Sequence, residues 1–487
     1  MSENILKGLK PELLWQRFFE ITQVPRPSKK EEKILAYLKN LCEELKLTYK
    51  EDKVGSLVIS IPATKGYEKA PVVVLQAHVD MVCEKNKGTE HDFDNDPLKL
   101  KIVDGWVAAE GTTLGSDNGI GMAAALAIIT DKDSVHGPLE VLLTVDEETG
   151  LTGASNLESG FITGKTLLNL DSEEDGAFYV GCSGGIDTAG IFNIQYEEHP
   201  KDCKCYELTI TGLKGGHSGL DIHTGRGNAI KLLARTLYAF DFKYHLSKIE
   251  GGSKRNAIPR EAEAYFCINS ADEKKLIAIV AKMNEDFKNE FNTADGNVLV
   301  KVAPTDCCCE KTYAPQFTEK FIKTLLALPH GVFQMSQDIE GLVETSTNLA
   351  TIVVEGDKIV VGSSQRSSIE SAKRYAANSV KSVFELAGAD VKTGDGYPGW
   401  KPNLDSPILH FSKDVYKKLY GKEPEIKAIH AGLECGILGD KEPGLDMISF
   451  GPTITGAHSP DEKVNIETVD KFYTLLKGIL KEIAEKA

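Results

Sequence analysis

Apolar positions along the chain follow two alternating patterns. Four short runs rich in Val, Leu and Ile, at residues 72–75, 139–145, 166–170 and 447–450, predict strands buried on both faces. Elsewhere apolar residues recur at helical spacing, as in residues 11–47, where Ser28-Lys29-Lys30-Glu31 fits a capping box. Alternating strands and helices predict an α/β fold with a mostly parallel sheet.

Side chains that can bind a metal or carry a proton follow each predicted strand. They are His78 and Asp80 after the first run, Glu147 and Glu148 after the second, Asp171 after the third and, beyond GPTITGA, His458 after the fourth. Parallel sheets bind ligands beyond the carboxyl ends of their strands. The alternative for His78 is a histidine at a strand end with a purely structural role. Because acidic or histidine residues follow all four predicted strands, a shared site is favoured.

A glycine-containing segment, GSDNGIG at residues 115–121, leads into an apolar, alanine-rich helix expected at 122–129. A phosphate-binding loop is disfavoured because no Gly-Lys-Ser/Thr follows. Gly119 and Gly121 are better explained by close packing of the helix. Asp117 would then lie at a helix N-terminus, where a carboxylate is favoured electrostatically.

A long segment between the third and fourth strands has strand and helix patterns of its own. Gly184-Gly185 and Gly394-Asp395-Gly396 mark plausible hinges at its ends. We therefore expect a catalytic domain in two parts, residues 1–183 and 397–487, interrupted by an inserted α+β domain, residues 184–396.

Composition narrows the class of protein. The 487 residues carry a formal net charge of −16, which disfavours a nucleic-acid partner. No apolar stretch approaches the ~20 residues of a membrane helix, and the N-terminus lacks the apolar core of a secretory signal. The ten cysteines form no disulfide-like framework, and neither Cys203-Lys204-Cys205 nor the run Cys307–Cys309 has zinc-site spacing. Reduced thiols and a cytoplasmic location are expected.

The polar residues at the strand ends form a hard set of nitrogen and oxygen ligands without cysteine. Such a set suits a hydrolytic centre of two zinc, manganese or cobalt ions. One carboxylate must bridge two such ions, and one can stay free as general base; the neighbours Glu147 and Glu148 suit that division. A two-metal phosphoesterase would want basic residues near the site, and a non-catalytic binding protein would not need the complete set.

Five motifs together resemble the co-catalytic zinc peptidases, which include aminoacylases, carnosinases and glutamate carboxypeptidases. The motifs are HVDM (78–81), GSDNGIG (115–121), VDEETG (145–150), NLD (169–171) and GAHSP (456–460). Their order and the inserted segment match across nearly the full chain. GSDNGIG and IHAGLECG (429–436) resemble the branch of aminoacyl-histidine dipeptidases. In this family the inserted domain acts as a lid or in dimerisation.

The resemblance implies a role for each residue of the metal site. His78 and Asp171 would bind one zinc ion, Glu148 and His458 the other, and Asp117 would bridge them, followed by a cis peptide bond to Asn118. It also implies that Glu147 is the general base. Asp80 would hold the second nitrogen of His78 and fix its tautomer.

Roles on the substrate side are implied in the same way. His217, in GGHSG, would donate to the oxyanion from the inserted domain, and Asn256 would contact the substrate. Arg366 would hold the free α-carboxylate, with a surface charge in a polar loop as the alternative. Gly432 would lie near that carboxylate. Glu434 and Cys307–Cys309 have no assigned role.

The implied activity is metal-dependent hydrolysis of dipeptides, by a water that two divalent ions activate. Zn²⁺ is the expected metal, with Mn²⁺ and Co²⁺ as alternatives. A preference for Xaa-His stays open, as do N-acyl amino-acid deacylase and tripeptidase activities, because the inserted domain sets the substrate. The expected partner is a small peptide, neither nucleic acid nor membrane. The inserted domain could form a homodimer or imitate one within the chain.

Overall fold

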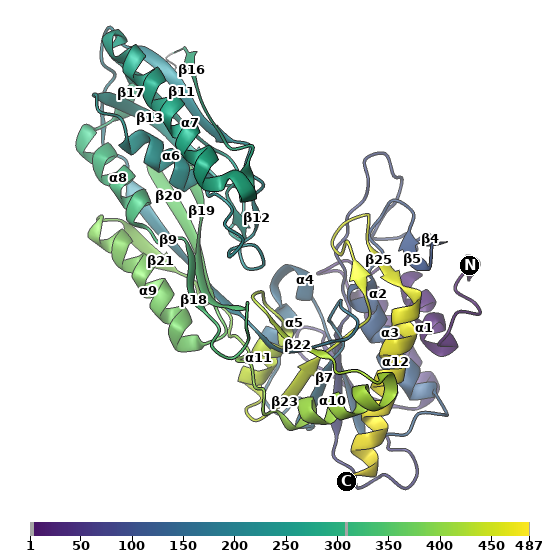
Figure 1. Ribbon diagram of the computed structural model, residues 1–487. Coiled ribbons are helices and arrows are strands. Elements are labelled where there is room, and N and C mark those ends of the chain that lie inside the picture. Colours follow the sequence, from purple (N-terminus) through teal and green to yellow (C-terminus); the bar gives the residue numbers. More distant parts are fainter. Residues whose placement is uncertain (1–3, 307–309, 487) are drawn as a thin grey trace. The chain divides into compact units, whose positions relative to one another are not determined.

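The computed structural model describes residues 4–306 and 310–486 (Figure 1), so the run Cys307–Cys309 lies outside the described residues. In this part of the chain no helix combines the length and apolarity needed to span a membrane. The chain separates into two compact units. Unit 1 comprises residues 1–181, 402–428 and 433–487, and unit 2 comprises residues 182–401 and 429–432.

Unit 1 is built on an eight-stranded mixed sheet. Its strands, in spatial order, are β1 (Thr48–Glu51), β2 (Leu57–Ile61), β6 (Leu139–Thr144), β3 (Val73–His78), β7 (Thr166–Asn169), β23 (Asp446–Ser449), β8 (Ala177–Cys182) and β22 (Glu425–Ile429). β3 pairs in parallel with β6 and β7, and β23 pairs in parallel with β7. β2 and β8 flank these four strands in antiparallel orientation. The expected α/β class is confirmed, and the four apolar runs are the central parallel strands.

Helices and a small second sheet complete unit 1. The helices are α1 (Glu12–Thr22), α2 (Glu32–Leu45), α3 (Ser116–Thr130), α4 (Glu147–Gly150), α5 (Thr152–Asn156), α10 (Pro407–Tyr420), α11 (Glu434–Lys441) and α12 (Ile466–Glu485). The small sheet contains β4 (Leu100–Val103), β5 (Trp106–Ala109), β24 (Ile454–Thr455) and β25 (Lys463–Asn465). α3 packs against β3 and is apolar all round, as expected for a helix enclosed by its neighbours.

The expected helical region at residues 11–47 is formed by α1 and α2, but the capping box predicted between them is wrong. Glu31 takes the N-cap position of α2 and makes no side-chain cap; its carboxylate accepts hydrogen bonds from the N–H groups of Lys29 and Asp146. The Ser28 hydroxyl instead donates to Asp80 Oδ2 at 2.8 Å. The connection between α1 and α2 therefore hydrogen-bonds to the residues that follow β3 and β6.

Unit 2 has an antiparallel sheet of nine strands. They are β16 (Leu299–Thr305), β11 (Lys204–Thr211), β15 (Ala262–Ile268), β13 (Tyr244–Gly251), β19 (Val343–Glu355), β20 (Lys358–Ser367), β9 (Gly184–Asn193) and β21 (Asp390–Thr393), with β18 (Gly331–Met335) paired to β19. Two-stranded pairs join β10 (Tyr196–Glu198) to β17 (Lys311–Tyr313) and β12 (Gly216–His217) to β14 (Ala257–Ile258).

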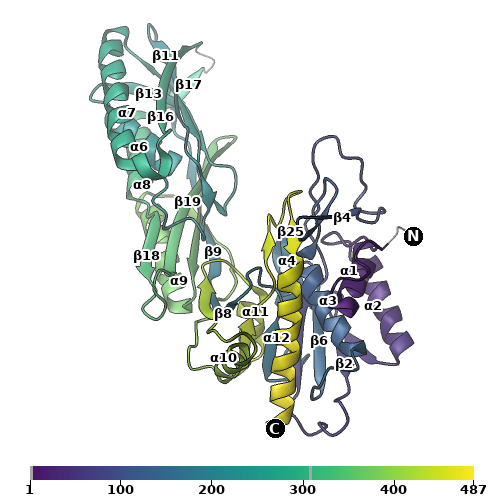
Figure 2. The ribbon, with the colours of Figure 1, turned by 45° about the vertical axis from the view of Figure 1, so that its right-hand side comes forward.

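Four helices cover one face of this sheet: α6 (Ala229–Tyr238), α7 (Glu273–Asp295), α8 (Pro315–Ala327) and α9 (Glu370–Leu386) (Figures 1 and 2). A short 3₁₀ turn, Ser270–Asp272, precedes α7. β11 shows the resulting alternation, because every second residue from Tyr206 is buried toward the helices. Phe192, Phe266 and Phe384 belong to the core enclosed in this way.

Candidate metal centre

The parallel strands of unit 1 end level with one another. His78, the last residue of β3, pairs with Thr144, the last residue of β6. Gln76 of β3 pairs with Asn169, the last residue of β7. The acidic residues that follow β6 and β7 therefore begin at the edge of the sheet that carries His78.

Asp117 lies between two histidines. His78 Nε2 is 3.1 Å from Asp117 Oδ1, and His458 Nε2 is 3.2 Å from Asp117 Oδ2. Each histidine faces a different oxygen of the same carboxylate. This is the arrangement that a bridging ligand between two metal ions requires.

Two further carboxylates lie beside the histidines. His78 Nε2 is 3.4 Å from Asp171 Oδ1, and His458 Nε2 is 3.0 Å from Glu148 Oε2. In each of two groups the potential ligand atoms all lie within 4.8 Å of one another: His78, Asp117 and Asp171, and Asp117, Glu148 and His458. The structure thus brings all five side chains together, in two groups that share Asp117. Four of the side chains are largely shielded from solvent, and His458 is 55% exposed.

The electrostatics of these groups favour cations. Hydrogen bonds with Asp117 and Glu148 raise the pKa of His458 to about 11. Burial raises the pKa of Asp171 to about 6, because its charged form is poorly solvated. Glu148 Oε1 is buried without a hydrogen-bond partner among the described residues. The site thus offers two imidazoles and three carboxylates, and one buried carboxylate oxygen is still unpaired. This ligand set fits two divalent ions such as zinc, manganese or cobalt.

Close packing places Asp117 at this point. A Cβ at Gly121 would lie 2.5 Å from the carbonyl oxygen of Leu170, so only glycine lets α3 approach the end of β7 so closely. This confirms the packing explanation of that glycine. The Asp117–Asn118 peptide bond is cis, as the resemblance implied. The Asn118 amide also donates to Asp171 Oδ1, which joins the two carboxylate-bearing segments.

Two buried charged residues that sequence reasoning missed hold the loop before Asp117. The Glu462 carboxylate accepts hydrogen bonds from the N–H groups of residues 114–116, at 2.7–2.9 Å, and from the Ser116 hydroxyl at 2.6 Å. The Arg26 guanidinium donates to the carbonyl oxygens of Val79 and Gly115. Neither residue belongs to a periodic pattern. The only signal was the position of Glu462 shortly after His458.

Asp80 is fully buried behind His78. Its Oδ1 lies 3.3 Å from His78 Nδ1, on the side of the ring that faces away from Asp117. Asp80 also accepts hydrogen bonds from the backbone N–H groups of Glu147 and Glu148. Burial alone would raise the pKa of Asp80, but the contact with His78 and these hydrogen bonds lower it to about 2. Asp80 is therefore a stable anion, placed directly behind the His78 ring.

Glu147 begins α4 next to the ligand groups. One of its carboxylate oxygens lies within 4.8 Å of ligand atoms of His78 and Glu148. Burial raises the pKa of Glu147 well above the usual value for a glutamate. Asp146, with a φ of 49°, makes the sharp turn from β6 into α4, which begins at Glu147.

Glu434, which the sequence left without a role, belongs to the support of the site. It is completely buried at the first position of α11. Its carboxylate accepts hydrogen bonds from the Gln76 amide at 2.6 Å and from the Thr144 hydroxyl at 2.7 Å. Burial raises its pKa to about 7. Glu434 thus fixes α11 to the ends of β3 and β6.

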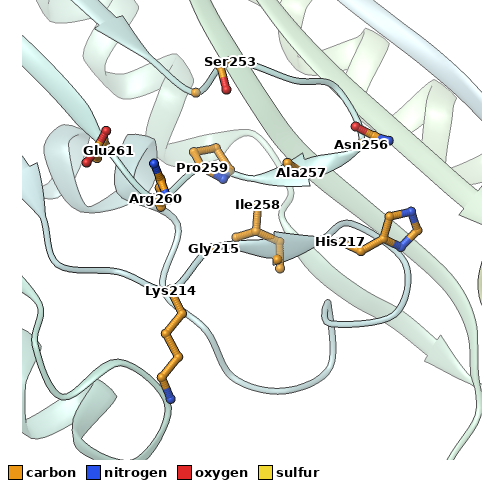
Figure 3. A pocket seen from close by; sticks show the side chains of 12 residues that line it. Lys214, Gly215, His217, Ser253, Asn256, Ala257, Ile258, Pro259, Arg260 and Glu261 are labelled. Carbon is orange, nitrogen blue, oxygen red and sulfur yellow. The ribbon is translucent and has the colours of Figure 1, made fainter. Parts of the chain in front are cut away.

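His217 and Asn256 of unit 2 lie at the same end of the β12–β14 pair (Figure 3). Both line a pocket of about 580 Å³. The His217 Nδ1 atom accepts hydrogen bonds from the N–H groups of Gly219 and Leu220, at 3.2 and 3.1 Å, which leaves the ring proton on Nε2. Burial lowers the pKa of His217 to about 4, and the nearby Arg366 charge acts in the same direction.

Arg366 lies in β20 and is buried, so the alternative of a surface charge in a polar loop is wrong. Its guanidinium donates to the Tyr397 hydroxyl at 2.9 Å and to the Ser218 hydroxyl at 3.3 Å. Gly432 lies beside the same tyrosine, because a Cβ there would be 3.0 Å from Tyr397 Cε2. Arg366, Asn256 and Tyr397 line a pocket of about 280 Å³. Sequence reasoning missed Tyr397, which follows a hinge glycine.

Comparisons with known proteins show the family to which the chain belongs. The cytosol non-specific dipeptidase of Escherichia coli K12 is 43% identical over 490 residues, which cover 100% of both chains. The solved aminoacylhistidine dipeptidase of Vibrio alginolyticus is 44% identical, with a TM-score of 0.89 over 99% of this chain and 98% of that one. The aminopeptidase PepT of Bacillus cereus, 19% identical, shares the fold with a TM-score of 0.57 over 98% and 99% of the two chains. Residues 74–482 match the model of peptidase family M20/M25/M40, and the chain belongs to that family.

Proposed function

We propose that this chain is a metal-dependent dipeptidase, with a dinuclear centre held by His78, Asp117, Glu148, Asp171 and His458. The observation that carries the proposal is the position of Asp117, whose two oxygens each face the histidine of a different ligand group. The full-length similarity to a cytosol non-specific dipeptidase supports the choice of substrate class. Zn²⁺ is the proposed metal, on the chemistry of the nitrogen and oxygen ligands.

Glu147 is the proposed general base. When bound, the two cations would act as Lewis acids that lower the pKa of a water toward about 7 and polarise the scissile carbonyl. A carboxylate oxygen of Glu147 accepts a proton from the attacking water and later donates it to the leaving amine. Burial raises the pKa of Glu147, which makes its carboxylate a better proton acceptor than that of an exposed glutamate.

His217 is the proposed donor to the oxyanion that forms at the attacked carbonyl. Its low pKa keeps the ring neutral, and its two backbone donors keep the proton on Nε2. A neutral Nε2–H can donate to a developing oxygen anion without itself titrating. The motif GGHSG, which resembles the family position, is the second support.

Arg366, Asn256 and Gly432 are the proposed contacts of the dipeptide. Arg366 already donates to Tyr397 and Ser218, and its remaining N–H groups can pair with a carboxylate. Asn256 lines the same pocket. A dipeptide always carries a free α-carboxylate, so a buried arginine at this point favours short peptides over internal bonds of long chains.

A substrate panel tests the proposal. Purified chain, loaded with Zn²⁺, Mn²⁺ or Co²⁺, is incubated with Ala-His, β-Ala-His, Gly-Gly, a tripeptide and an N-acetyl amino acid. We expect hydrolysis of the dipeptides, and the ratio of Ala-His to Gly-Gly turnover measures any preference for Xaa-His. Turnover of the tripeptide alone or of the N-acetyl amino acid alone would replace the proposal with one of those activities. No dipeptide turnover with any metal would overturn it.

Assembly and location form the remaining part of the proposal. The inserted domain could form a homodimer or imitate one within the chain, and light scattering at several concentrations measures the mass that separates these two arrangements. We also expect a cytoplasmic location, in line with the cytosolic name of the E. coli relative. Cell fractionation of the tagged chain tests that expectation.

A further inference from the structure

A second cluster of metal-ligating side chains lies in unit 2, apart from any residue proposed for peptide hydrolysis. It consists of His199, Cys203, Cys205 and Cys267, each of which offers one ligand atom within 4.8 Å of the others. We propose that these four residues form a structural Zn²⁺ site, occupied when the cysteines are reduced.

Strand pairing brings two of the sulfurs together. Cys205 of β11 lies directly opposite Cys267 of the neighbouring antiparallel strand β15. Residues opposite each other on antiparallel strands share a face of the sheet. On that face Glu263 and Tyr265 of β15 are only partly buried, whereas Cys267 is 1% exposed. A covering segment therefore closes over Cys267.

The connection between β10 and β11 supplies that cover and the other two ligands. His199 directly follows β10, the chain reverses through residues 200–202 with a φ of 59° at Asp202, and Cys203 directly precedes β11. His199 Nε2 lies 3.7 Å from Cys205 Sγ and 3.9 Å from Cys203 Sγ. These are nearly the separations between ligand atoms around one tetrahedral zinc ion.

The imidazole is already oriented for a metal. His199 Nδ1 lies 2.9 Å from the carbonyl oxygen of Pro200, which can only accept, so Nδ1 carries the proton. The lone pair is then on Nε2, and Cys205 Sγ is the nearest sulfur to it, at 3.7 Å. A backbone carbonyl that fixes the tautomer of a ligand histidine is a common support of zinc sites.

The ligand chemistry separates this site from the hydrolytic centre. Three sulfurs and one imidazole nitrogen form a soft set, typical of closed structural zinc sites. The centre of unit 1 has no cysteine. With four protein ligands, the ion would have no open position for a substrate. Its role would be structural, because it would link the β10–β11 connection to β15.

Cysteine oxidation state controls whether the site can form. The expectation of reduced thiols is wrong for Cys205, which is disulfide-bonded in the structure. A thiol reductant would deliver two electrons and two protons to that disulfide, yielding two protein thiols while the reductant becomes a disulfide. The three cluster thiols then lose one proton each as the ion binds. Sequence spacing missed the site because Cys267 joins only through strand pairing.

Cobalt substitution tests the proposal, since thiolate–Co²⁺ charge transfer in the near ultraviolet cannot arise from a centre without cysteine. Full-length chain is reduced with a phosphine, stripped of metal and titrated with Co²⁺. We expect a thiolate charge-transfer band and intense tetrahedral bands that saturate at one equivalent beyond those of the hydrolytic centre. Zn²⁺ should displace them.

Variants then assign the signal. Cys203→Ser and His199→Gln should lose most of the charge-transfer intensity and one equivalent of bound metal. Cys83→Ser, which removes a thiol in unit 1, is the matched control and should retain both. Absence of the band in reduced wild type, or a band of unchanged intensity in Cys203→Ser, would overturn the site. Thermal unfolding of each variant confirms that it is folded, and dipeptide turnover is not the readout.

Discussion

The Asp80 carboxylate accepts a hydrogen bond from the backbone N–H of Glu147 at 3.0 Å. The residue proposed to orient His78 therefore also fixes the start of α4, which carries the proposed base. A carboxylate at a helix N-terminus is favoured by the unpaired N–H groups there. One anion thus contacts both the proposed ligand from β3 and the start of the helix that carries the proposed base.

Asp80→Asn should lower kcat/KM for Ala-His by roughly 10–100-fold and weaken binding of the metal held by His78. The amide removes the charge that stabilises His78 and presents one N–H₂ group toward the donors of α4. Steady-state kinetics and metal titration measure the two effects. Asp414→Asn, on the exposed side of α10, is the control. Unaltered kinetics in Asp80→Asn would remove its positioning role.

Glu147→Gln should keep both metal ions but lower kcat by roughly 10²–10⁴-fold, because the amide cannot accept the proton of the attacking water. Metal content by elemental analysis and turnover of Ala-His are measured on the same sample. Glu158→Gln, an exposed change, should behave as wild type. A fully active Glu147→Gln enzyme would show that another group is the base.

Glu462→Gln should destabilise unit 1 by about 3 kcal/mol, since a buried carboxylate that accepts several N–H groups is replaced by an amide that cannot satisfy them all. We also expect weaker metal binding, because Glu462 holds the loop before Asp117. Denaturant unfolding and metal titration report these effects. The exposed change Glu467→Gln is the control, and equal stability of the two variants would contradict the supporting role.

Arg366→Lys should raise KM for dipeptides by roughly 10–100-fold, the loss expected when one charged hydrogen bond of about 1.5–3 kcal/mol disappears. The effect should vanish with C-terminally amidated dipeptides, which lack the carboxylate. Arg374→Lys, on the exposed face of α9, serves as the matched change. An equal KM increase for acid and amide substrates would exclude the carboxylate contact.

His330 should make folding of unit 2 sensitive to acid. Burial lowers its pKa from 6.5 to about 4, and its Nδ1 lies within hydrogen-bonding distance of the N–H of Leu349 and the amide of Asn228. Between these two pKa values the unfolded state binds a proton at this histidine and the folded state does not. The contribution of His330 to the free energy of unfolding is therefore fully present above pH 6.5 and is lost as the pH falls toward 4. At 1.36 kcal/mol per pKa unit the loss is about 3 kcal/mol.

His330→Asn should flatten this decline, measured as the free energy of unfolding in denaturant at several pH values. The same substitution at the exposed His410 should leave the slope unchanged. A slope in His330→Asn that equals that of wild type would show that other groups cause the decline.

The sequence predicted the central strands and the side chains at their ends because both leave local signals. A run such as residues 139–145 is mainly apolar, and Glu147 follows two residues after its end. His78, Asp117 and Asp171 were found for the same reason, since each stands in a short motif with a fixed place on a strand or helix. The parallel register then brings such ends together without further information.

The residues that could not be found from the sequence contact segments far from them along the chain. No local sequence pattern therefore identifies them. Glu462 binds the backbone of residues 114–116, and Arg26 reaches the carbonyl oxygen of Gly115. Ser28 was assigned to a helix cap because its spacing fits one, yet its hydroxyl contacts Asp80. In the sequence, a charged residue in a polar loop looks the same whether it is buried or solvated, because only the fold shows which groups surround it.

Unit 1 is assembled from both ends of the chain, which has a consequence for synthesis. β23, the strand between β7 and β8, and the residues His458 and Glu462 are all made after unit 2. Because synthesis proceeds from the N-terminus, a growing chain holds one group of ligands long before the other. With the proposed ligand set, a chain released before His458 is made would lack one ligand and could not form the dinuclear centre.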